Sequence, residues 1–181
     1  LGSASMFNTT LGDINNDGWP DLLAMAYGRQ WNLCWENNGD GTFKEIGLEN
    51  GFAGDHIFHG RYPSWLKRPA EKAFRSNGNT FDCAVGDYDN DGDMDLYLGE
   101  IKHYWAGESS DPPSVLENMG IERNWAFRRF PVTVFLPVRK FRTPKKYNYA
   151  DLHVSWADFD NDGWLDLLIG CGDYPDGQFL R

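Results

Sequence analysis

The sequence lacks long apolar runs and has few cysteines. None of its 181 residues belongs to a stretch of roughly 18 uncharged apolar residues, so no membrane span is predicted. No basic leader followed by an apolar segment is visible, and the first residue is Leu1, so we expect a processed product or a fragment. Cys34, Cys83 and Cys171 form no CxxC pair, which argues against a zinc ribbon or a dithiol redox motif. Buried thiols and a single disulfide both remain open.

Basic residues are also scarce. The chain has 17 Lys and Arg against 27 Asp and Glu, a formal net charge of −10, which disfavours nucleic acid as a partner because phosphate is repelled. Eight of the basic residues lie between Arg123 and Ala150, where there is no acid. Twelve of the acids lie in three segments, 13–21, 87–95 and 158–166. Such dense negative charge is costly unless a cation lies within it.

No catalytic motif is recognisable. The sequence has no G-x-S-x-G and no glycine-rich phosphate-binding loop. Carboxylates are abundant in the three acidic segments, but there we expect them to bind metal rather than to act in catalysis. The sequence therefore favours a protein that is not an enzyme.

The three acidic segments are repeats of one pattern, D-x-[DN]-x-D-G-x-x-D, at spacings of 74 and 71 residues. An apolar run follows each copy, and the residues before the second and third copies, 80–86 and 152–157, have the composition of strands. A second element, E-N-x-G, occurs at 36–39 and 117–120, and aromatic strand-like segments follow it at 42–46 and 125–130. Each unit thus predicts four short strands.

Four antiparallel strands per unit predict an all-β fold of β-propeller blades. We assign blade 1 to residues 1–77 with an insert at 53–77, blade 2 to 78–149 with a long basic and aromatic insert at 100–148, and a truncated blade 3 to 150–181. Only 63–75 is expected to contain a helical turn. About two full blades and a partial third cannot close a ring, so we expect other copies of the chain, or the remaining blades of a larger chain, as partners.

The repeated loop has the chemistry of a cation site. Side chains at loop positions 1, 3, 5 and 9 can converge, the Gly at position 6 permits a sharp turn, and position 7 can offer its carbonyl oxygen. Hard oxygen ligands in a flexible loop favour Ca²⁺ over Mg²⁺. An EF-hand is disfavoured because its acidic position 12 is occupied here by Ala24, Leu98 and Ile169.

With these three loops and the segment 36–43, the chain resembles FG-GAP/VCBS repeats, most closely the type found beside the ASPIC/UnbV domain, and integrin α-subunit propellers carry a related calcium loop. The resemblance implies an extracellular, calcium-loaded β-propeller. It implies about three Ca²⁺ ions, one per loop, held by Asp13, Asn15, Asp17, Trp19 and Asp21; by Asp87, Asp89, Asp91, Asp93 and Asp95; and by Asp158, Asp160, Asp162, Trp164 and Asp166. Position 7 would contribute its carbonyl.

Two consequences follow for these sites. Asn15 stands where the other loops have Asp, so the first site is expected to be the weakest. Three bound Ca²⁺ ions would add six positive charges and change the formal net charge from −10 to −4. We therefore expect calcium to contribute to folding itself.

The function predicted from these features is that of a structural or adhesive extracellular module that self-assembles by completing strands or blades between copies. The inserts would present a surface for a glycan or a protein. Trp65, Trp105 and Trp125 lie in or beside them and are candidates for stacking on sugars, although packing between blades explains aromatics as well. The alternative is part of a secreted lyase or hydrolase acting on polysaccharides, or its glycan-binding scaffold.

Overall fold

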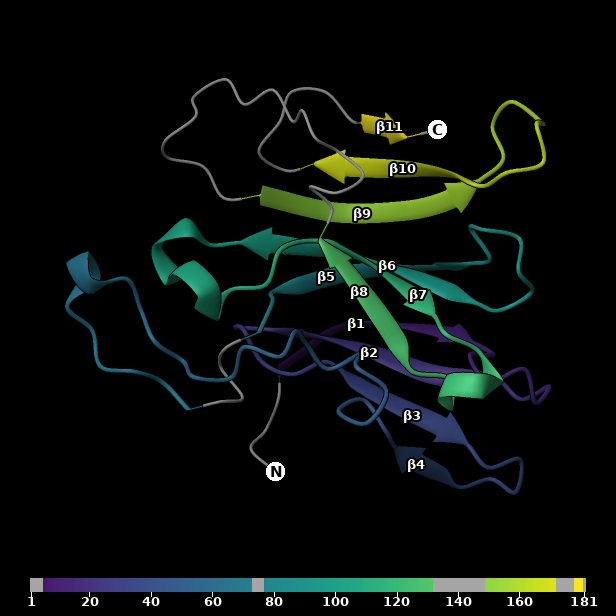
Figure 1. Cartoon of the computed structure of the whole chain (residues 1–181), viewed down its shortest axis with the longest axis horizontal. Coiled ribbons are helices and arrows are strands. Elements are labelled where there is room, and N and C mark those ends of the chain that lie inside the picture. Colours follow the sequence, from purple (N-terminus) through teal and green to yellow (C-terminus); the bar gives the residue numbers. More distant parts are fainter. Residues whose placement is uncertain (1–4, 73–76, 132–148, 172–177, 181) are drawn as a thin grey trace.

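The chain forms antiparallel β-sheets, as expected of an all-β protein (Figure 1). The structure is a computed structural model that describes residues 5–72, 77–131, 149–171 and 178–180. The first sheet has the order β1-β2-β3-β4, with β1 at Ser5–Gly12, β2 at Asp21–Tyr27, β3 at Leu33–Asn37 and β4 at Phe43–Glu45. Each strand pairs with the next along the chain, so the sheet is a simple meander.

The second sheet repeats this arrangement. Its strands are β5 (Thr80–Gly86), β6 (Asp95–Lys102), β7 (Ser114–Asn118) and β8 (Phe127–Pro131), and each pairs with the next. A third meander contains β9 (Tyr149–Ala157), β10 (Asp166–Cys171) and β11 (Gln178–Leu180). The end of β6 also pairs with the start of β9, through Ile101 with Ala150 and Lys102 with Tyr149, which joins the second and third meanders.

Alternate side chains of β6 lie in two different cores. In β6, Leu96 and Leu98 pack into a core shared with Leu23 and Met25 of β2, whereas Tyr97 packs into a second core with Leu167 and Ile169 of β10. Both faces of β6 are therefore buried, and the three meanders lie face to face as successive layers (Figure 1). Full burial of each Leu stabilises the fold by about 1.5–3 kcal/mol. Layered antiparallel sheets of this kind are consistent with a β-propeller type of fold.

The helical content differs from the sequence prediction. A 3-10 turn, η1, lies at Ser64–Leu66 inside the expected range 63–75. Two more, η3 at Tyr104–Ser109 and η4 at Ile121–Arg123, were not predicted, because their sequences have no helical period and their backbone is set by tight turns. In the range 100–148 that the sequence assigns to an insert, β7 and β8 continue the second sheet, and residues 132–148 lie outside the described part.

Cys34 and Cys83 are free and buried, whereas the side chain of Cys171 lies outside what the structure describes. None of the helices in the described ranges has the length and apolar character to cross a membrane.

Candidate metal centre

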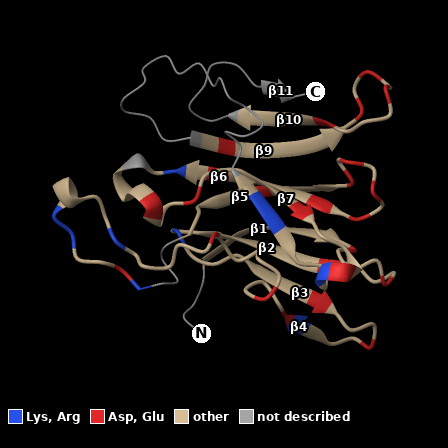
Figure 2. Ribbon diagram, in the orientation of Figure 1, with Lys and Arg blue, Asp and Glu red and all other residues tan. Residues whose placement is uncertain are grey.

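The three acidic segments are loops that connect the first two strands of each meander. Loop 1 (13–21) joins β1 to β2, loop 2 (87–95) joins β5 to β6, and loop 3 (158–166) joins β9 to β10. Figure 2 shows that acidic residues gather in these loops at one end of the layered sheets. The sheets therefore bring segments more than seventy residues apart in the sequence to one side of the molecule.

Loop 2 is held by hydrogen bonds from its own backbone to its carboxylates. The Asp91 N–H donates to Asp87 Oδ1 (3.0 Å) and to Asp89 Oδ1 (3.3 Å), and the Gly92 N–H donates to Asp87 Oδ2 (3.0 Å). The Asp93 N–H donates to Asp91 Oδ1 (2.9 Å). Each acid thus accepts from an amide two to five residues further on, which winds the loop around its carboxylates.

The same bonds recur in the other two loops. In loop 3 the amides at positions 5, 6 and 7 donate to the acids at positions 1, 3 and 5 over 2.9–3.3 Å, and in loop 1 the corresponding distances are 2.8–3.2 Å. Position 4 has a positive φ in every copy, as does the Gly at position 6: Asn16 (52°), Asn90 (58°), Asn161 (57°), Gly18 (90°), Gly92 (96°) and Gly163 (93°). Asn and Gly tolerate this left-handed region best, so the N-D-G sequence is what the turn requires.

The acid at position 9 is buried and anchors the loop to the sheet. Asp95 Oδ2 accepts the Tyr88 N–H (3.1 Å), and its Oδ1 accepts the Asn118 N–H (2.7 Å) at the end of β7. Asp21 accepts the Ile14 and Asn37 amides in the same way, at 3.0 and 2.8 Å. The E-N-x-G element of the sequence is therefore part of the loop's support.

Three acids converge in loops 2 and 3. One carboxylate oxygen from each of Asp87, Asp89 and Asp95 lies within 4.8 Å of the others, and the same holds for Asp158, Asp160 and Asp166. These are positions 1, 3 and 9, and together they could hold a metal ion. Position 5, which sequence reasoning placed among the ligands, is in neither group. Its Oδ1 accepts the position 7 N–H, and its role as a ligand stays a prediction. In loop 1 the corresponding residues are Asp13, Asn15 and Asp21.

Burial and repulsion between neighbouring acids raise the pKa of several carboxyl groups in loop 2. Burial, followed by repulsion from Asp89 and Asp91, raises the pKa of Asp95 to about 7. Burial and the neighbouring Asp91 raise the pKa of Asp89, and the same two causes raise that of Asp93. A bound cation would reverse these shifts by stabilising the ionised carboxylates.

Neighbouring loops are linked by an asparagine that sequence reasoning did not single out. The side-chain amide of Asn16 in loop 1 donates to the Gly92 carbonyl (3.1 Å) and to Asp93 Oδ1 (2.7 Å) of loop 2. Asn90, at the equivalent position of loop 2, donates to the Gly163 carbonyl of loop 3 (3.2 Å). The Asn at position 4 of every loop is the sequence feature that could have indicated this contact. The residue that it contacts, however, lies in the next repeat.

Comparison with protein families identifies this repeated unit. Residues 13–98 match the family model described as an FG-GAP-like repeat. Over this range the chain is similar to an FG-GAP-like repeat. The matched FG-GAP-like region begins at the first residue of loop 1 and ends within β6, so it contains loops 1 and 2. A comparison with curated proteins gave no match.

Loop 3 lies outside the matched range but has the same hydrogen bonds and the same positive φ angles as the two loops of the FG-GAP-like region. The chemistry of the donors fits a hard divalent cation, because the converging atoms of loops 2 and 3 are carboxylate oxygens. No His or Cys belongs to either group among the described residues, so a softer transition metal has no preferred ligand there.

Proposed function

We propose that the chain is a calcium-binding β-propeller module of an extracellular protein with a structural or adhesive role. The observation that carries the proposal is the repetition of one loop geometry three times, with three carboxylates converging in loops 2 and 3. Ca²⁺ is favoured over Mg²⁺ because carboxylates in an irregular loop can supply the larger, less regular shell that Ca²⁺ accepts.

In this proposal the acids at positions 1, 3 and 9 hold the ion in loops 2 and 3, and Asp13, Asn15 and Asp21 hold it in loop 1. When bound, the ion would neutralise the acids and fix the turn between the first two strands of each unit. An extracellular location is supported by calcium availability, since sites of this kind fill at the millimolar concentrations found outside cells.

The partners we propose are further blades, from other copies or from a larger chain. Phe7 and Leu11 of β1 are 57% and 61% exposed, and the Phe7 ring lies 4.4 Å from that of Phe81 in β5. Such an apolar surface along two neighbouring strands favours coverage by another layer. Sedimentation with calcium and then with EDTA tests assembly: a calcium-dependent oligomer supports completion between copies, and a monomer in both conditions contradicts it for this chain.

Calcium titration calorimetry and thermal unfolding test the ion proposal. We expect about three binding events and a melting temperature that is higher in Ca²⁺ than in EDTA, since ligand at 100 times its Kd stabilises a fold by about 2.7 kcal/mol. Asp89→Asn and Asp160→Asn should each weaken one site. Glu122→Gln, an exposed acid in η4 outside the loops, is the matched control and should leave all sites intact. A melting temperature indifferent to calcium would overturn the proposal.

A further inference from the structure

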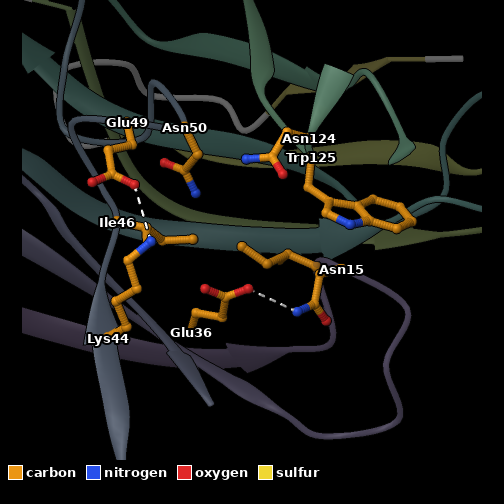
Figure 3. A pocket seen from close by; sticks show the side chains of 9 residues that line it. Asn15, Glu36, Lys44, Ile46, Glu49, Asn50, Asn124 and Trp125 are labelled. Atoms are coloured by element: carbon orange, nitrogen blue, oxygen red, sulfur yellow. Dashed lines mark hydrogen bonds and ion pairs between the residues drawn. The ribbon is translucent and has the colours of Figure 1, made fainter. Parts of the chain in front are cut away.

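A small hollow lies between the first sheet and the turn that joins β7 to β8 (Figure 3). The first sheet contributes one wall from loop 1, β3, β4 and the segment after β4, and the β7–β8 turn contributes the other. The lining residues are Ile14, Asn15, Glu36, Lys44, Ile46, Glu49, Asn50, Asn124 and Trp125. Apart from the two Ile residues and Trp125, all of these side chains are polar.

Trp125 lies in this wall and has an unfavourable backbone conformation. Its φ is 56° and that of Asn124 is 53°, so two consecutive residues other than glycine adopt the left-handed region. For a bulky side chain this conformation is strained, and it persists only when the surroundings impose it. Here the Trp125 N–H donates to the Gly120 carbonyl (2.9 Å) and the Ala126 N–H to the Arg123 carbonyl (3.2 Å).

The corresponding turn of the first sheet avoids this cost. Between β3 and β4 the positive φ angles belong to Gly39 (72°) and Gly41 (88°), which adopt them without strain. A glycine at position 125 would serve the turn equally well. The presence of Trp there therefore favours a role for the indole at the hollow rather than a role in the turn.

The two sheets also differ in the side chain that pairs with the Glu of the E-N-x-G element. Glu117 faces Arg128 across β7 and β8, and the two form an ion pair at 2.6 Å. Glu36 faces Lys44 at the equivalent place in β3 and β4, but Lys44 pairs with Glu49 instead (3.2 Å). The Glu36 carboxylate accepts from the Asn15 amide (3.2 Å) and borders the hollow (Figure 3).

Asn15 makes this arrangement possible. Loops 2 and 3 have Asp at the same position, and an Asp beside Glu36 would repel it. The amide instead donates to Glu36 while its oxygen accepts the Asp17 N–H (3.2 Å). The departure of loop 1 from the acidic pattern thus supports a carboxylate that faces the hollow.

We propose that this hollow binds a neutral sugar residue of a glycan, with Trp125 against the C–H face of the ring and Glu36 accepting hydroxyl hydrogen bonds. The Asn124 amide supplies both a donor and an acceptor, which hydroxyl groups require. The amides of Asn15 and Asn50 line the hollow but already make hydrogen bonds within the protein. The formal charge of the lining is −1, from Glu36, Glu49 and Lys44, so phosphate and uronate groups are disfavoured. Six of the nine lining side chains are polar, which suits a ligand with many hydroxyl groups better than an apolar one.

The test is titration calorimetry of the full chain with neutral hexaoses of glucose, mannose and xylose, with oligogalacturonate as the acidic comparison, each in Ca²⁺ and in EDTA. We expect at least one neutral hexaose to bind and oligogalacturonate not to bind. Sugar binding that occurs in Ca²⁺ but not in EDTA would connect the hollow to loop 1 through Asn15. Sugar binding in both conditions would support the hollow as the site even if the loops hold no calcium.

Two variants assign the binding to the hollow. Trp125→Gly relieves the positive φ, so it should fold and should lower affinity at least tenfold, and Glu36→Ala should lower it several-fold. Trp65→Ala removes a Trp that is 65% exposed in η1, outside the hollow, and should change nothing. Absence of binding to all neutral hexaoses, preference for oligogalacturonate, or unchanged affinity in both hollow variants would overturn the proposal.

Discussion

The acid at loop position 9 combines two properties that oppose each other. Asp95 is fully buried among backbone amides that favour its charged form, yet burial and the neighbouring acids raise its pKa to about 7. Asp21, in the same place in loop 1, also has a raised pKa, with burial as the main cause. Loop 2 without calcium should therefore hold a proton near pH 7 that a cation displaces.

The first prediction is that calcium binding releases protons and weakens in acid. Ca²⁺ requires the deprotonated carboxylate, so below pH 7 the affinity of loop 2 should fall by up to about tenfold per pH unit. Calorimetry at pH 6.5 in two buffers of different ionisation enthalpy measures the protons released. Asp95→Asn should reduce the proton release of loop 2, and Glu122→Gln should retain it. Equal affinity at pH 8 and pH 6 would contradict this account of Asp95.

At the scale of elements, each E-N-x-G turn supports an acidic loop through its Asn. The Asn118 side chain donates to the Met94 carbonyl (3.1 Å) in loop 2 and to the Ile14 carbonyl (2.8 Å) in loop 1, and its oxygen accepts the Gly120 N–H (3.1 Å). Asn37 makes the equivalent local bonds, to the Pro20 carbonyl and from the Gly39 N–H. The bond to Ile14 connects two meanders.

The second prediction concerns this difference between the two Asn residues. Asn118 is buried, so Asn118→Ala leaves polar backbone groups without partners and should destabilise the fold by about 2–3 kcal/mol. Asn37 is less buried and its bonds stay within one unit, so Asn37→Ala should cost about 1 kcal/mol. Urea unfolding of both variants measures the free energies. Equal losses would show that the bond to Ile14 adds nothing.

Local signals account for what the sequence predicted. Strands at Thr80–Gly86 and Ser114–Asn118 follow from short runs of strand-favouring residues next to turn residues, and the loop turns follow from the φ preferences of Asn and Gly. The contact of Asn16 with Asp93 joins different repeats, so the spacing within one repeat does not reveal it. The Trp125 conformation was likewise hidden, because aromatic residues normally indicate a strand there.

At the scale of the whole molecule, a buried charged cluster joins the segments between strands to the second sheet. Glu100 of β6 and Asp111 before β7 are both fully buried, and Arg129 of β8 lies 4.0 Å from Glu100. Asp111 Oδ2 accepts the Asp55 N–H (2.9 Å) from the segment after β4. Burial and repulsion from Asp55 raise the pKa of Asp111 to about 7, although Arg129 and Lys102 oppose the shift.

This cluster should make global stability depend on pH. The folded state binds the Asp111 proton more tightly than the unfolded state, whose pKa is near 3.8, so the contribution of this group is greatest below about pH 4 and is lost as the pH rises to about 7. Asp111→Asn cannot ionise, and its amide oxygen can still accept the Asp55 N–H.

The third prediction is therefore that Asp111→Asn melts above the parent chain at pH 8 and that the difference shrinks or disappears at pH 5. Melting curves in EDTA measure this without the contribution of calcium, and Glu122→Gln, an exposed acid, should follow the parent at both values. A variant that is less stable than the parent at pH 8 would mean that attraction to Arg129 and Lys102 outweighs the cost of burying the charge.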